Sequence, residues 1–151
     1  MVRKGSTATF GGAVAIAAAF FLLGEVAWAQ TIDFELRTFP ESPVVFADSG
    51  NVPVPGIPRR QLVTVKNQSK KSVAAVMFEQ SVAAGSKTEI VALERVSILF
   101  AAGEKRRVSV AVAEILQKMQ SGERPVLSVV AVEFMDGSQW TAPTSSNARA
   151  R

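Results

Sequence analysis

Polar and apolar residues alternate one by one along several stretches of this chain, which is the pattern of half-buried β-strands. The clearest stretch is 31–37, where Ile32, Phe34 and Leu36 fall on one face and polar residues fall on the other. A second is 107–112, where three valines occupy alternate positions. Each stretch predicts a strand with one face on a core and one face in water.

Two β-prone runs, 61–66 and 73–80, are separated by the polar stretch 67–72. We expect them to be adjacent strands joined by a turn. The end of the chain carries a hairpin signal, because Asp136 and Gly137 follow a long β-prone run and precede Trp140. Further strands are predicted at 44–47, 89–94, 96–100, 126–135 and 138–141.

Two segments break this pattern. Residues 38–60 hold five prolines and two glycines, so most of the segment cannot join the centre of a sheet. Residues 114–121 change to a helical period, with Ile115, Leu116 and Met119 on one face and a glycine directly after them. We expect a short helix there, bridging two strands across one end of the domain.

Short strands at intervals near ten residues, with one small helix, predict an all-β antiparallel β-sandwich. The stretch 63–78, an Asn–x–Ser turn followed by lysines between two valine-rich strands, resembles the immunoglobulin-like accessory domains of bacterial exported proteins. So does the later order of Gly103, Glu104, a basic valine-rich strand and a closing strand into Trp140. The resemblance covers most of 31–141 and implies an architecture without implying a partner, since the cysteine pair of antibody domains is missing.

The start of the chain has the layout of a secretory signal peptide: a basic stretch, an uncharged run over 5–24, and small residues at Ala27 and Ala29. Cleavage is expected before Gln30. The alternative is a retained N-terminal anchor, because the uncharged run approaches the length that spans a bilayer. The predicted organisation is therefore a signal-peptide helix at 1–29, a β-sandwich domain at 30–142 and a disordered tail at 143–151.

Composition narrows the chemistry. The chain has no histidine, cysteine or tyrosine, which excludes Ser–His–Asp and Cys–His sites and the ordinary zinc and copper sites. We therefore expect no enzyme activity, no cofactor and no metal. Asp33 and Glu35 are the remaining catalytic option, against the simpler interpretation that they are solvated surface residues. The oxygen-rich run 48–51 lacks the glutamate that would complete a calcium loop.

The net charge of +4 falls by one when 1–29 is removed. So small an excess, in an exported chain, predicts no nucleic-acid partner. The basic cluster at 105–107, together with Lys70 and Lys71, is a candidate contact for an anionic surface, or a device that protects a sheet edge. Asn67 to Ser69 matches an N-glycosylation acceptor, a pattern that is common by chance.

The proline-rich segment 52–58 is the preferred interaction candidate, because a semi-rigid extended chain loses little entropy on docking. The alternative is that it is a plain surface loop. Trp140 is either an exposed anchor or a residue that closes the sandwich. The candidate interaction residues are Val52, Pro53, Val54, Pro55, Pro58, Lys105, Arg106, Arg107 and Trp140.

These observations favour a non-enzymatic interaction or structural module that is periplasmic or secreted and binds a protein of the cell envelope. One alternative is a module that binds glycans or anionic lipid through Trp140 and the basic cluster. Another is an accessory subunit of a membrane complex, anchored by a retained 1–29 segment.

Overall fold

The computed structural model of the protein describes residues 31–143. The signal-peptide segment, with Ala27, Ala29 and the expected cleavage point at Gln30, lies outside the described residues, as does the tail from 144 onward. Residues 31–143 contain no helix long and apolar enough to cross a bilayer.

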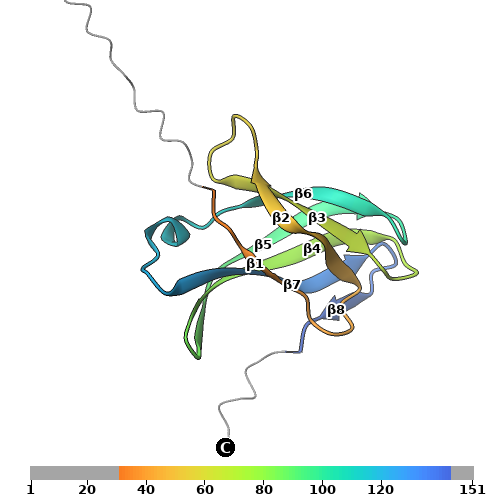
Figure 1. Ribbon diagram of the computed structural model, residues 1–151. Coiled ribbons are helices and arrows are strands. Elements are labelled where there is room, and N and C mark those ends of the chain that lie inside the picture. The colour runs from red at the N-terminus through yellow and green to blue at the C-terminus, as the bar shows by residue number, and fades with distance from the viewer. Residues whose placement is uncertain (1–30, 144–151) are drawn as a thin grey trace, which may run out of the picture.

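Within this range eight strands form two sheets that pack face to face (Figure 1). The five-stranded sheet has the order β1-β7-β4-β5. Strand β8 is its fifth strand and pairs with β7 on the same side as β1, at a later part of β7. The three-stranded sheet has the order β2-β3-β6. The strands are β1 (Glu35–Arg37), β2 (Val44–Pro53), β3 (Arg60–Asn67), β4 (Val73–Ala84), β5 (Lys87–Phe100), β6 (Lys105–Ala111), β7 (Glu123–Phe134) and β8 (Gln139–Thr141).

The all-β sandwich expected from the alternation is confirmed. The two sheets, β1-β7-β4-β5 with β8 and β2-β3-β6, are the two layers of this sandwich. All pairings are antiparallel except that of β1, which runs parallel to β7 over Glu35–Arg37. The chain passes from one sheet to the other in the loops at the ends of the sandwich.

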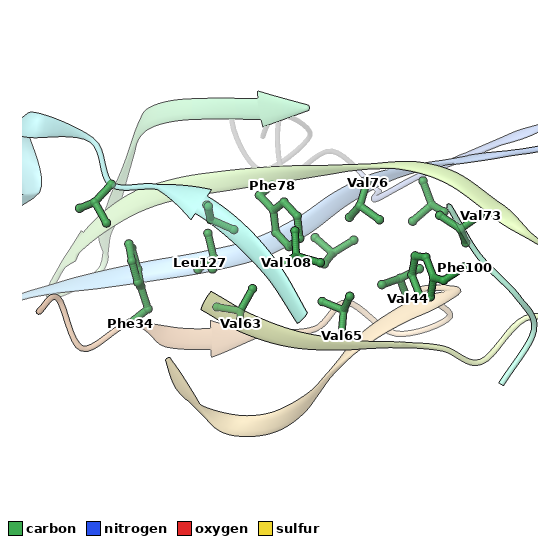
Figure 2. Packing of buried hydrophobic residues seen from close by; sticks show 14 of the residues in the cluster. Phe34, Val44, Val63, Val65, Val73, Val76, Phe78, Phe100, Val108 and Leu127 are labelled. Carbon is green, nitrogen blue, oxygen red and sulfur yellow. The ribbon is translucent and has the colours of Figure 1, made fainter. Parts of the chain in front are cut away.

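The core is the layer between the two sheets (Figure 2). Valines dominate it, because a branched side chain suits the pleated surface of a strand and fills the space between facing sheets. Phe78 is fully buried, and its ring centroid lies 6.3 Å from that of Phe46. Ile32 and Phe34 are buried as expected, although the regular strand there is only Glu35–Arg37.

One expectation about neighbours is wrong. The runs 61–66 and 73–80 are strands β3 and β4, but they belong to different sheets. The polar stretch between them crosses from one sheet to the other, and it starts at Asn67, which is fully buried. The backbone N–H of Asn67 donates to the Glu104 carbonyl at 3.0 Å, and its own carbonyl accepts from Gly103 at 2.8 Å. This bonding ties β3 to the start of β6 and sends the chain away from that sheet.

Two predicted strands, 89–94 and 96–100, are one continuous strand, β5, paired with β4. The two strands form a hairpin with the two-residue loop Gly85–Ser86, where Gly85 has a φ of 58°. Hairpins with a two-residue loop favour glycine where φ is positive. A register shift between Gln80 and Ser81 marks a bulge in this pair.

The predicted helix at 114–121 is a 3-10 helix at Glu114–Lys118. It links β6 of one sheet to β7 of the other, as expected for a bridge across one end. Leu116 is buried and Met119 is partly buried, but Ile115 is 53% exposed, so the predicted apolar face is only partly correct. The segment has no side-chain hydrogen bond at its N-terminus, and so short a helix depends on tertiary contacts.

Candidate functional site

The segment 52–58, which we call the proline loop, consists of the last two residues of β2 and the turn that leads to β3, and it projects from the sandwich (Figure 1). The N–H of Ile57 donates to the carbonyl of Val54 at 3.2 Å, which closes a β-turn over Pro55 and Gly56. Gly56 has a φ of 73°, the conformation that the second central residue of a type II turn requires after proline. The loop is therefore a defined turn on a hairpin.

Hydrogen bonds hold the base of this loop. Asn51 donates from its amide nitrogen to the Ile32 carbonyl at 2.6 Å and also to the side-chain oxygen of Gln61. The N–H of Val112 donates to the Arg59 carbonyl at 2.7 Å. These contacts connect the base of the loop to the extended segment before β1 and to the residue that follows β6, so the base is fixed from two directions.

The surface of the proline loop is apolar. Val52 is 52% exposed and Ile57 is 50% exposed, and Pro53, Pro55 and Pro58 are exposed as well. A packed domain ordinarily leaves large aliphatic residues exposed one at a time, whereas here they gather on one loop. Ile57 was not singled out from the sequence, although its position between two prolines and after the turn glycine placed it in the same segment.

The basic residues divide into two groups. Lys105 lies directly opposite Lys66 across β6 and β3, and Arg107 lies opposite Thr64. Since Val63, Val65 and Val108 face the core, the alternation places Lys66, Lys105 and Arg107 on the outer face of the three-stranded sheet. We call these three residues the cationic patch. Within the described residues they take part in no ion pair.

The basic residues Arg106 and Lys71 form ion pairs, unlike those of the cationic patch. Arg106 forms an ion pair with Glu104 at 2.7 Å. Lys71 forms an ion pair with Asp136 at 2.7 Å, donates to the Ser138 hydroxyl at 2.8 Å, and lies 5.4 Å from the centroid of the Phe134 ring. The ion pair and the Ser138 hydrogen bonds hold the pKa of Asp136 well below its usual range. Lys71 therefore joins two end loops, while the cationic patch stays open on the sheet.

Lys66 was missed by the sequence analysis. The signal was available, since strict alternation after Val63 and Val65 places Lys66 on the outer face of its strand. What alternation does not supply is the register between β3 and β6, and it is the register that brings Lys66 opposite Lys105. Cross-strand neighbours have Cβ atoms about 4.5–5.5 Å apart, a distance at which like charges repel.

Trp140 does not lie with these cations. It pairs with Val132 in the five-stranded sheet, and its side chain is partly buried against the core. Lys105 and Arg107 are on the outer face of the other sheet. A single site that uses both the tryptophan and the basic cluster is therefore not formed.

The two carboxylates considered for catalysis, Asp33 and Glu35, lie beside a shallow, open groove of about 520 Å³. Glu35 accepts from Arg37 at 3.2 Å and from Arg124 at 3.1 Å, which makes it part of a surface ion-pair cluster. In residues 31–143 no three acidic side chains come close enough together to hold a metal ion. The other residues around the groove are Phe34, Leu36, Thr38, Phe46, Ala47 and Asp48.

The amide of Asn67, the glycosylation candidate, is enclosed. It donates to the carbonyls of Lys71 at 2.7 Å and Ala101 at 3.1 Å, and its oxygen accepts from the backbone and the hydroxyl of Ser69. The residue has no exposed surface. The folded domain therefore has no room for a glycan on Asn67. The hydrogen bonds of the Asn67 side chain instead connect the loop after β3 to the loop after β5.

A second apolar surface follows β5, which is an edge strand of the five-stranded sheet. Ile90, Leu93 and Leu99 are 58%, 60% and 62% exposed, respectively. The sequence analysis predicted strands here but gave this surface no role, because it did not place β5 at an edge.

No family model, curated protein or solved structure matches the chain.

Proposed function

We propose that this protein is a non-enzymatic binding module of the periplasm or the cell exterior, and that it docks a protein partner on the proline loop. The observation that carries the proposal is the exposure of Val52 and Ile57 on a loop whose turn and base are both hydrogen-bonded. Export follows from the signal-peptide layout of residues 1–29, and an anchored accessory subunit is the form expected if that segment is retained.

The physical case for the proline loop is preorganisation. A loop that is already ordered gives up little conformational entropy when a partner covers it. The aliphatic side chains of Val52 and Ile57 lose contact with water on docking, which supplies about 25 cal/mol for each Å² of apolar surface covered.

The test is affinity capture from envelope extract followed by a binding titration with each purified candidate partner. Val52→Ser and Ile57→Ser are expected to weaken binding about tenfold or more each, as loss of an apolar anchor does. Ile115→Ser is the matched control, because Ile115 is equally exposed but lies on the 3-10 helix. Equal binding by all three variants would count against the proline loop.

A second candidate function is binding to an anionic lipid surface through the cationic patch. The observation that favours it is the direct opposition of Lys66 and Lys105 in the absence of a paired carboxylate within the described residues. Flotation with phosphatidylglycerol vesicles at increasing salt tests it, and reversing the charge of Lys66, Lys105 and Arg107 should abolish binding. Trp140→Ala is expected to leave vesicle binding unchanged, because Trp140 packs against the core of the domain.

A further inference from the structure

Strand β5 forms an outer edge of the five-stranded sheet, and the end of β6 lies beside it only near Glu94, whose carboxylate accepts from the N–H of Ala111. Strand β5 spans Lys87–Phe100, which is 14 residues, and it pairs with β4 on one side only. The backbone groups on its other side have no strand partner within the described residues. Such an edge is a template for a further strand.

The other sheet edges carry features that discourage pairing. β6 bears the cations Lys105–Arg107, and β2 contains Pro53 together with a register shift between Phe46 and Asn51. Strands β1 and β8 have three residues each. Charge, proline, irregularity and shortness are the devices by which proteins protect sheet edges.

The second half of β5 carries two charged side chains, Glu94 and Arg95, and both are held by partners within the domain, Glu94 by Arg60 and by the N–H of Ala111. Arg95 is its one cation there, and that side chain is turned back over its own sheet. Arg95 forms an ion pair with Glu133 of β7 and donates to the Ser97 hydroxyl at 2.8 Å. On either side of it, Leu93 and Leu99 remain about 60% exposed on the outer face.

We propose that β5 pairs with β5 of a second copy of this chain, antiparallel and centred on Val96, to form a two-fold dimer with a continuous sheet. This pairing sets Leu93 against Leu99 of the other copy, twice by symmetry, and sets Arg95 against Ser97. A two-fold axis normal to the sheet keeps outward residues of both copies on one side. The most exposed apolar residues of the strand then cover one another.

Charge disfavours the registers centred on Glu94 and on Arg95, and the register centred on Ser97 sets Arg95 against Leu99 and leaves Leu93 without a leucine partner. A pairing centred on Glu94 opposes the two Glu94 carboxylates, and one centred on Arg95 opposes the two guanidinium groups. Like charges directly opposite one another are destabilising in a sheet. The pairing centred on Val96 is the nearest one that opposes no like charges and matches leucine with leucine.

The first test is sedimentation equilibrium of the purified chain, with its N-terminus defined by intact mass. We expect a monomer–dimer equilibrium in which Leu93→Lys and Leu99→Lys each raise the dissociation constant about tenfold or more, because each change acts twice in a symmetric interface. Ile115→Lys is the control, since Ile115 is as exposed but lies on the 3-10 helix, and it should leave the constant unchanged. Circular dichroism establishes that each variant is folded.

The second test fixes the register and uses the absence of cysteine from the chain. Val96→Cys places the two thiols directly opposite one another in the proposed dimer, whereas Ile98→Cys separates them by four residues. We expect Val96→Cys to form the disulfide-linked dimer much faster under mild oxidation. Equal rates for the two variants, or a wild-type chain that is monomeric up to millimolar concentration, would overturn the proposal and leave the edge to a strand of a different protein.

Discussion

The guanidinium of Arg60 and the carboxylate of Glu94 form an ion pair across the two sheets, with Nη2 and Oε1 3.0 Å apart. Arg60 lies on β3 and Glu94 lies on β5, so this contact joins the three-stranded sheet to the edge of the five-stranded one. The other carboxylate oxygen of Glu94 accepts from the N–H of Ala111 at 2.7 Å. Arg60 also donates to the hydroxyl and the carbonyl of Ser109, both at 2.8 Å. A polar bridge thus joins the two sheets along one side of the sandwich.

We expect Glu94→Gln to destabilise the domain by about 1 kcal/mol, because the ion pair is lost while one hydrogen bond to Ala111 can be retained. Glu94→Ala should lower the free energy of unfolding further, since it leaves Arg60 and the Ala111 N–H without their shared acceptor. Urea unfolding measures both. Glu114→Gln, which changes the more exposed Arg59–Glu114 contact of 3.6 Å, is the control and should have little effect.

Asn67→Ala is expected to lower the free energy of unfolding by about 2–3 kcal/mol or more, because the carbonyls of Lys71 and Ala101 lose a buried donor. Ser69→Ala removes only groups that bond to Asn67 and Lys71 near the surface, so its cost should be smaller. Equilibrium denaturation compares the two. A similar cost for both variants would show that the Asn67 amide does not brace the end loops.

Acid should weaken the contact between the end loops. The Lys71 ion pair and the Ser138 hydrogen bonds depress the pKa of Asp136 in the folded state, so their stabilisation is present above the ordinary value of about 3.8 and is lost as pH falls below it. Asp136→Asn should therefore lower the melting temperature at pH 7, and the difference from the wild type should shrink below about pH 4. A difference that stays constant down to pH 2 would contradict this assignment.

The pKa of Glu79 is shifted in the opposite direction to that of Asp136. Burial on the outer face of the five-stranded sheet raises its pKa above the ordinary 4.5, and the nearby Arg37 charge only partly opposes this. The folded state therefore holds the proton more tightly than the unfolded chain, and ionisation at higher pH costs stability. We expect Glu79→Gln to raise the melting temperature at pH 7–8 and to have no effect near pH 4. Glu89→Gln, at the exposed end of the hairpin, is the control.

Alternation in the sequence was sufficient to assign faces. It predicted that Ile32 and Phe34 are buried and that Val108 and Val110 lie on the face opposite Arg107. It was also sufficient for the last hairpin, because Asp136–Gly137 carries its own turn chemistry.

Alternation did not assign neighbours. A period of two says which side chains share a face, but it does not say which strand lies alongside. For that reason β3 and β4 were paired in the prediction although they belong to different sheets, and Lys66 was not placed opposite Lys105. The Gly85–Ser86 turn was a local signal of the β4–β5 hairpin, and recognising it would have joined the two predicted strands at 89–100 into one.

The position of β7 between β1 and β4 governs the order in which this chain can fold. During synthesis or translocation from the N-terminus, the β2–β3 and β4–β5 hairpins emerge before β7, and one side of β4 stays unpaired until residues 123–134 follow. Until then both β4 and β5 have an unpaired edge, and the pairing of β4 with β7 joins residues that are far apart in the chain, which slows folding. A chain halted before residue 123 would therefore expose the strand-pairing surface on which aggregation begins.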